Sequence, residues 1–299
     1  MNHAPVSHRV TNGVLDKPDR RTILRTLAAA VSAAGFIHVR SAAAAADSSW
    51  DKVAASGVLK VGVIPSRPPY FWLQDGKWTG FSAEMGREVT AALAKTMNRQ
   101  VETKFVETTW PTVILDLQSG RLDAFFGLSY SKQRAEALNL FGPLYALPEV
   151  AVNKVGFAPG TDWASYNKPA VRVSVVMGTT DADAAKKQLP HAQITEFKGM
   201  AEAVLAVQSG HTDTLITTAL VALGAMKENP SLGQMVVLDP TYTQPSYGGT
   251  RHDSDGKLAS FLQSWAVEYR KSGRCKQVIL AAMREYGVNV DKLPPGVDF

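Results

Sequence analysis

The chain has 299 residues, enough for two lobes of roughly 100 to 150 residues, and its 45% hydrophobic and 20% charged content is ordinary for a globular protein. Its net charge of +5 arises mainly at the N-terminus, where the first 46 residues carry six Lys or Arg and two Asp or Glu. The remainder has 26 basic and 25 acidic side chains. This balance excludes a strongly basic surface, so we expect no nucleic-acid partner.

Residues 1–46 are typical of an export signal. Arg20 and Arg21 precede a short alanine-rich apolar run at 27–37, and the small residues at 42–46 offer cleavage sites. The run is shorter than the about 20 apolar residues that span a bilayer. The arginine pair favours the twin-arginine export route, with the Sec route as the alternative. We therefore expect a periplasmic protein whose signal peptide is removed.

A nine-residue pattern occurs twice, 90 positions apart. Residues 115–123 and 205–213 share the spacing L-x-x-Q-S-G-x-x-D. In each copy an apolar helix ends at a glycine, which favours the left-handed conformation that closes a helix, and a strand-like run follows. The period is too long for a solenoid. The repeat predicts two lobes that use the same helix-to-strand element, and chance similarity is the alternative.

Strand-like and helix-like segments alternate along the chain, which favours an α/β fold with mainly parallel sheets. Two stretches, 150–155 and 242–250, lead from the first half to the second and back. We expect residues 47–152 and 242–299 to form one lobe and residues 153–241 the other, with a ligand between them. The expected strands are 58–64, 100–107, 124–128, 171–177, 214–217 and 235–238, and the expected helices are 81–93, 180–189, 258–269 and 276–286.

Arg134 follows two small hydroxyl residues, Ser129 and Ser131. A planar guanidinium binds two carboxylate oxygens at once, and hydroxyl groups can complete such a site. The pattern is compatible with a carboxylate receptor, and a surface arginine on an amphipathic helix is the alternative.

Four segments together resemble the family 3 extracellular solute-binding proteins, the periplasmic receptors of polar amino-acid ABC importers. They are GVLKVGVIPSRPPYFW at 57–72, GKWTGFSAEMGREVTAAL at 76–93, LQSGRLDAFFGLSYSKQR at 117–134 and FGPLY at 141–145. The resemblance implies a type II periplasmic-binding-protein fold, in which two lobes joined by two hinge crossings close around a small anionic or zwitterionic solute. It also implies docking on an inner-membrane ABC permease. We expect a monomeric binding protein without cofactor or metal, and no enzymatic activity.

The resemblance also places binding residues in the first lobe. Arg134 matches the family's carboxylate-binding arginine, and Gly127 and Ser129 match positions whose backbone or hydroxyl groups reach the ligand. Tyr70 matches an aromatic residue that lines or backs the pocket. Trp110 is interpreted as a packing residue.

In the second lobe, Thr179 and Thr180 match a hydroxyl turn that opens a helix, where free N–H groups attract an anion. A plain threonine helix cap is equally compatible with the sequence. Thr218 stands where the family usually has the acid that binds an α-ammonium group, and Arg67 stands where it often has a stacking aromatic residue. The alternative for Arg67 is a surface loop arginine. The sequence thus predicts two pocket arginines and no pocket carboxylate, which favours an organic acid, a dicarboxylate or an acidic amino acid over lysine, arginine or histidine.

Two other functions remain open at this point. The first is a periplasmic dehydratase-like enzyme on the same fold, for which Glu149 is the acid of interest, although the sequence lacks hydrolase and metal-site motifs. The second is an accessory binding protein for a periplasmic oxidoreductase. Cys275 is the only cysteine, so no intramolecular disulfide is possible.

Overall fold

The computed structural model describes Met1, residues 48–65 and residues 67–293. The expected signal peptide and its cleavage region lie outside the described residues, as do Ser66 and the tail at 294–299. Within the described ranges, no helix combines the length and the apolar character needed to span a bilayer.

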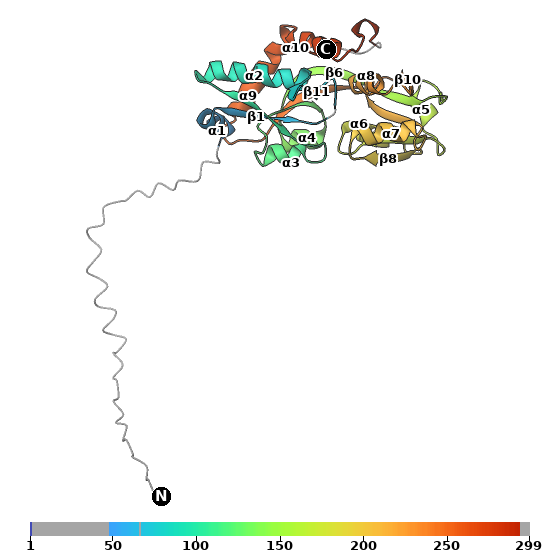
Figure 1. Cartoon of the computed structure of the whole chain (residues 1–299), viewed down its shortest axis with the longest axis horizontal. Coiled ribbons are helices and arrows are strands. Elements are labelled where there is room, and N and C mark those ends of the chain that lie inside the picture. The colour runs from blue at the N-terminus through green and yellow to red at the C-terminus, as the bar shows by residue number, and fades with distance from the viewer. Residues whose placement is uncertain (2–47, 66, 294–299) are drawn as a thin grey trace, which may run out of the picture. The chain divides into compact units, whose positions relative to one another are not determined.

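The helices and strands form two groups, here called lobe 1 and lobe 2, which share two strands (Figure 1). The shared strands are β6 (Asn139–Lys154) and β11 (Thr243–Thr250). Lobe 1 contains α1 (Ser49–Ser56), β1 (Val58–Val63), β2 (Trp72–Gln74), β3 (Lys77–Thr79), α2 (Phe81–Met97), β4 (Glu102–Glu107), α3 (Val113–Gln118), β5 (Phe125–Ser129), α4 (Lys132–Ala137), α9 (Lys257–Lys271), α10 (Arg274–Glu285) and the short 3-10 helix η1 (Val290–Lys292). Lobe 2 contains α5 (Trp163–Tyr166), β7 (Arg172–Val176), α6 (Thr180–Gln188), β8 (Gln193–Phe197), α7 (Met200–Gln208), β9 (Thr214–Thr218), α8 (Ala219–Glu228) and β10 (Leu232–Val237).

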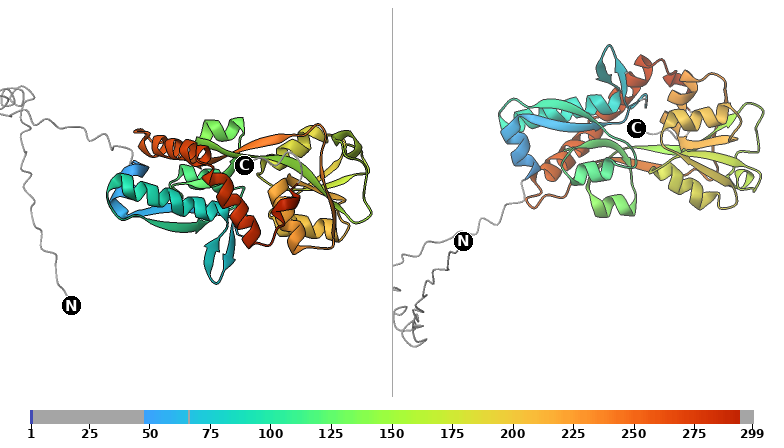
Figure 2. Two further views of the ribbon diagram at one scale, coloured as in Figure 1. Left: turned by 90° about the horizontal axis from the view of Figure 1, so that it is seen from above. Right: turned by 60° about the horizontal axis from the view of Figure 1, so that its bottom comes forward.

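One sheet runs through both lobes in the order β5-β11-β6-β9-β7-β8, and β10 also pairs with β6. Figure 2 shows green β6 and orange β11 running between the lobes, at the two crossings that the sequence predicts. The expectation of mainly parallel sheets is only partly correct. The pairs β1–β4, β7–β8 and β7–β9 are parallel, but every pair that involves β6 or β11 is antiparallel. The physical reason is that the two crossing strands run in opposite directions between the lobes.

Two hydrophobic cores correspond to this arrangement. The larger one fills lobe 1 and extends to the helices of lobe 2 that face it, and the smaller one uses only residues between Ala151 and Leu238. The four-residue periodicity read from the sequence over 81–93 is confirmed, because all four of its apolar side chains are fully buried on α2: Phe81, Met85, Val89 and Leu93.

The repeated sequence pattern corresponds to the same structural element in each lobe. Both copies end a helix with a glycine in the left-handed region, at φ +72°. The terminal acid of each copy then binds the first parallel strand of its own lobe. Asp123 accepts a hydrogen bond from the backbone N–H of Lys60 at 2.8 Å, and Asp213 accepts one from that of Arg172 at 2.9 Å. The prediction of a common helix-to-strand element is therefore confirmed.

We expect Asp213→Asn to destabilise the protein by about 1.5–3 kcal/mol, because the carboxylate also accepts charge-assisted bonds from Arg172 Nη2 at 2.7 Å and Lys154 Nζ at 2.6 Å. Burial opposes the ionisation of Asp213, but these bonds outweigh it and lower its pKa to about 2. A depressed pKa contributes stability above the pKa of the unfolded chain, and this stability is lost as the pH falls towards 2. Urea unfolding at pH 7 and pH 3 measures both effects. Glu196→Gln, in the more exposed pair with Lys186, is the control and should cost under about 1 kcal/mol.

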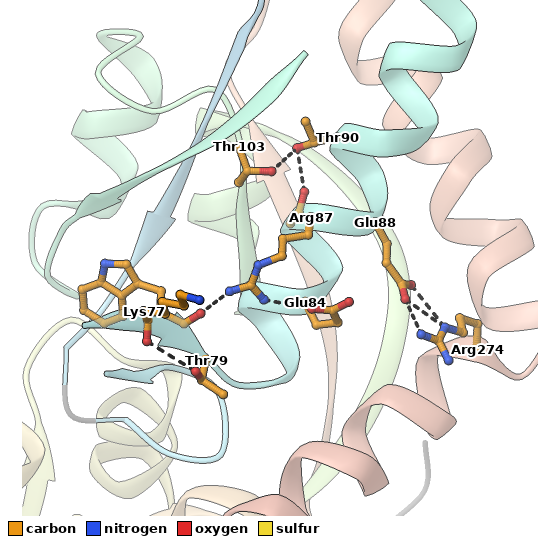
Figure 3. A network of polar contacts seen from close by, with 10 residues as sticks. Lys77, Thr79, Glu84, Arg87, Glu88, Thr90, Thr103 and Arg274 are labelled. Carbon is orange, nitrogen blue, oxygen red and sulfur yellow. Dashed lines mark hydrogen bonds and ion pairs between the residues drawn. The ribbon is translucent and has the colours of Figure 1, made fainter. Parts of the chain in front are cut away.

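A polar network fixes the outer side of lobe 1 (Figure 3). Arg87 on α2 donates to the carbonyl of Trp78 in the β2–β3 hairpin and to Glu84 at 2.8 Å. Further along α2, Glu88 accepts from Arg274 Nε of α10 at 3.0 Å. The network therefore attaches both the hairpin and a C-terminal helix to α2. The sequence patterns did not predict this hairpin.

Candidate functional site

Arg134 is held at the junction of the two lobes by backbone carbonyl groups. Its Nη1 donates to Ser129 O of lobe 1 at 2.9 Å, and its Nη2 donates to Gly178 O of lobe 2 at 3.1 Å. The side chain is buried. Because a guanidinium has five N–H donors, these two bonds leave others for a ligand. Burial lowers the pKa of Arg134 to about 10, against the effect of nearby Asp181 and Asp183, so the group stays charged at neutral pH.

The two serines near Arg134 have different roles from the expected hydroxyl shell. Ser131 is the N-cap of α4, and its hydroxyl accepts a hydrogen bond from the backbone N–H of Arg134 at 3.2 Å. Ser129 contacts the guanidinium through its carbonyl oxygen. The alternative of a surface arginine is wrong, since Arg134 is only 4% exposed.

Arg67 is also buried, so the interpretation as a surface loop arginine is wrong. Its guanidinium carbon lies 4.4 Å from the ring centroid of Trp110 and 5.1 Å from that of Tyr70. Its Nε is buried without a hydrogen-bond partner, and no ion pair joins Arg67 to any residue that the structure describes. A buried cation that packs on aromatic faces without an ion pair is costly unless a nearby anion or a ligand neutralises it.

Trp110 packs in the core as predicted, and it also lines the pocket. Its ring packs edge-on against Phe125 with centroids 5.8 Å apart, and its face also forms a wall of the pocket beneath Arg67. The order of residues could not indicate this, because the contact joins loops that are distant in sequence.

The lobe 2 side of the site is the beginning of α6. Thr179 is its N-cap, with a hydroxyl that accepts from Ala182 N at 3.2 Å and donates to Val176 O at 2.7 Å. The capping interpretation is therefore confirmed for Thr179, while Thr180 follows it on the pocket wall. Thr218, at the end of β9, has a buried hydroxyl without a hydrogen-bond partner.

Asp181 corrects the prediction that the pocket has no carboxylate. It follows Thr180 in the first turn of α6, is 5% exposed and accepts a hydrogen bond from Thr217 Oγ1 at 2.9 Å. Burial raises its pKa, while the charges of Arg67 and Arg134 lower it. Asp181 was not among the predicted residues because it does not stand at a position where the family usually has a binding acid, such as that of Thr218. The available signal was an aspartate directly after two predicted pocket residues.

All eight predicted site residues line one cavity at the lobe junction. Trp110 and Asp181 complete its wall. The free space is only about 10 Å³, roughly that of one water molecule, so an amino acid requires the lobes to move apart before it enters. Two larger cavities, of about 180 and 170 Å³, also have Arg67 in their walls. The predicted residues in the small cavity are Arg67, Tyr70, Gly127, Ser129, Arg134, Thr179, Thr180 and Thr218.

Residues 59–278 match the model of the bacterial extracellular solute-binding proteins, family 3. The chain belongs to this family. This family 3 protein is 26% identical over 178 residues to a probable histidine-binding protein of Campylobacter jejuni, a match covering 58% of the chain and 65% of that relative. It is 22% identical over 265 residues to the glutamate/aspartate import solute-binding protein of Escherichia coli, with 86% of each chain covered.

The two-lobe fold of this family 3 protein is also found in a solved structure. The ancestral amino acid-binding protein AncCDT-1, a precursor of cyclohexadienyl dehydratase, matches with a TM-score of 0.68 and 27% identity. The match covers 80% of this chain and 99% of that one. The expected fold class, a two-lobe α/β binding protein, is confirmed.

Proposed function

We propose that this family 3 protein is the periplasmic receptor of an ABC importer and that it captures an amino acid with an acidic side chain between its lobes. The observation that carries the proposal is the convergence of Arg134, Asp181 and Arg67 on one buried cavity. Arg134 would bind the α-carboxylate, Asp181 the α-ammonium group and Arg67 the second acidic group.

The charges in the cavity support a solute of net charge −1. Arg67 and Arg134 contribute two positive charges. We assign one negative charge to Asp181, because the two guanidinium groups favour its ionised form against the burial that raises its pKa. A solute that leaves a charge uncompensated in a buried site binds more weakly. A cationic amino acid would leave two arginines beside an additional cation, so lysine, arginine and histidine fit poorly.

The cellular location and the transport role of this protein are proposed from its family membership. The family consists of extracellular proteins of bacteria. We propose export to the periplasm with removal of residues 1–46, delivery of the solute to an inner-membrane permease, and a monomeric receptor without cofactor. We also propose that the chain passes from lobe 1 to lobe 2 after residue 152 and returns after residue 241.

A thermal-shift screen tests the solute class, because a ligand that binds only the folded state raises the melting temperature. The protein should be unfolded and refolded first, which removes any solute that copurifies. L-Glutamate and L-aspartate should raise the melting temperature more than L-glutamine, succinate, L-histidine or L-arginine. Stabilisation by cationic amino acids alone would contradict the proposal.

Arg67→Gln should change the selectivity of the site more than its stability. We expect affinity for L-glutamate to fall by at least about 2 kcal/mol, roughly 30-fold, while affinity for L-glutamine changes little. The reason is that only the acidic side chain needs the positive charge of Arg67. Calorimetry with both ligands measures the difference, and Arg121→Gln, an exposed arginine paired with Asp116, is the control. Equal losses for both ligands would assign Arg67 to the α-carboxylate instead.

A dehydratase-like activity is the second candidate, and buried acids beside the cavity favour it. Burial raises the pKa of Asp181, as a general acid requires, and AncCDT-1 is described as a dehydratase precursor. Glu149, the acid that the sequence singled out, is buried, interacts with Asp181 and is not on the cavity wall. Turnover of prephenate by the purified protein, lost in Asp181→Asn, would establish this activity.

A further inference from the structure

A second buried carboxyl group, near enough to interact with Asp181, lies in one of the two strands that connect the lobes. Glu149 is in the middle of β6, is 0% exposed, and pairs in register with Thr218 of β9. Its Oε1 accepts a hydrogen bond from Gln244 Nε2 of the other crossing strand, β11, at 2.6 Å. Glu149 thus joins both crossing strands to the pocket wall.

The remaining oxygen of Glu149 has no donor among the described residues. Oε2 is buried without a hydrogen-bond partner. The neighbouring carboxyl of Asp181, itself only an acceptor when ionised, interacts with Glu149 through its charge and can bond to it only when a proton lies between the two groups. Two adjacent carboxylates in a buried site cannot both be ionised without strong repulsion. A proton between them removes the repulsion and satisfies the unpaired oxygen.

We propose that Glu149 and Asp181 hold one proton between them, and that this proton sets the charge that the pocket presents to its ligand. With the proton, the pair carries one negative charge and the pocket has a net charge of +1. Without the proton, the pocket is neutral overall and the ionised Glu149 repels Asp181. Glu149 is therefore a positioning residue for Asp181 and a determinant of ligand charge. This inference rests on the proposed function for its ligand effect only.

The surroundings of the pair support this distribution. Burial raises the pKa of Glu149 well above its ordinary value, and the neighbouring Asp181 raises it further. Arg67 lowers the pKa of both acids, and Arg134 lowers that of Asp181, because both guanidinium groups lie on the pocket side. Gln244 on β11 and Thr217 on β9 donate to the ionised forms, and Tyr70 completes the titratable groups that face the pair. The proton therefore resides mainly on Glu149.

The direction of the pH effect follows from this arrangement. A carboxyl whose pKa is raised on folding binds a proton that the unfolded chain has already released, so stability is lost as the pH rises from the ordinary range of glutamate to the folded value. Affinity for an anionic solute falls over the upper part of the same range, as the pocket loses its net positive charge.

The test compares wild type with Glu149→Gln, whose amide retains a donor toward Asp181 but cannot lose it. In urea unfolding without ligand between pH 5 and pH 9, the unfolding equilibrium constant of wild type should rise relative to that of the variant, by up to 10-fold per pH unit for one proton. Asp181→Asn should reduce the same pH dependence without abolishing it, because it removes the charge of the partner acid but leaves Glu149 buried. Glu196→Gln, far from the pair, should follow wild type.

Binding of L-glutamate provides an independent arm of the test. Wild-type affinity should fall as the pH rises towards 9, and Glu149→Gln affinity should not. Parallel unfolding profiles for wild type and both pair variants would overturn the shared proton, whatever the ligand result. A pH-dependent difference in unfolding without any glutamate binding would retain the proton and reject the proposed ligand class.

Discussion

Arg134→Ala should abolish high-affinity binding while leaving a folded protein. The loss expected for one partner of a buried charge pair is about 2–5 kcal/mol, roughly 30- to 5,000-fold in Kd. The alanine removes the charged group that faces the cavity and also the hydrogen bond to Gly178 O, which joins the lobes. Isothermal titration with L-glutamate measures the loss.

Two variants make this result specific to the geometry of Arg134. Arg134→Lys keeps the charge but cannot offer two parallel N–H donors, so it should recover only part of the affinity. Arg121→Ala removes an exposed arginine of the same lobe and should have no effect. Unchanged affinity in Arg134→Ala would remove Arg134 from the site.

Gly224→Ala should weaken binding without touching the pocket. Gly224 lies in α8 of lobe 2, and a Cβ there would be 2.2 Å from the carbonyl oxygen of Pro68 in lobe 1. Because the Cβ is fixed to the helix and the Pro68 oxygen belongs to the backbone, neither atom can rotate away, so either the lobes stay apart or the loop that carries Arg67 shifts. A ligand that contacts both lobes loses affinity in either case, by roughly 10-fold or more.

The same substitution should not destabilise lobe 2 itself, because alanine is favoured over glycine inside a helix by about 0.5–1 kcal/mol. Urea unfolding separates this effect from ligand affinity. Gly199→Ala is a control for added bulk at another glycine of lobe 2, the N-cap of α7, since a Cβ at Gly199 would meet nothing within 4 Å. X-ray scattering with saturating L-glutamate should give a larger radius of gyration for Gly224→Ala than for the control. Equal affinities for the two alanine variants would show that this contact does not limit closure.

Much of this fold could be predicted because its signals are local. The periodicity of α2, the paired helix-to-strand elements and the two crossings each follow from neighbouring residues along the chain. The parallel-sheet prediction was wrong for β6 and β11, because strand direction depends on pairing between distant segments. The hairpin of β2 and β3 is too short, at three residues a strand, to produce a clear alternating pattern.

The site also has features that the sequence predicts locally and features that depend on distant contacts. Arg134 and Thr179 lie in recognisable local motifs, and the structure brings the predicted residues to one cavity, although their binding of a ligand stays a prediction. The burial of Arg67 against Trp110 and the contact of Glu149 with Gln244, 95 residues away, depend on how the two lobes meet. No spacing in the sequence reports such contacts, whereas the pocket acid Asp181 directly follows two predicted pocket residues and could have been recognised from its position.

In the proposed receptor, the carbonyl of Gly178 would compete with the ligand for Arg134. It occupies a donor of Arg134 that an incoming carboxylate could use. A carboxylate forms charge-assisted hydrogen bonds about twice as strong as those of a neutral carbonyl, so it can displace this internal acceptor with a net gain. An amide or ester group would exchange one neutral acceptor for another and gain little. We therefore expect analogues that lack a carboxylate to bind weakly, because they cannot displace this internal acceptor with a net gain as the lobes close.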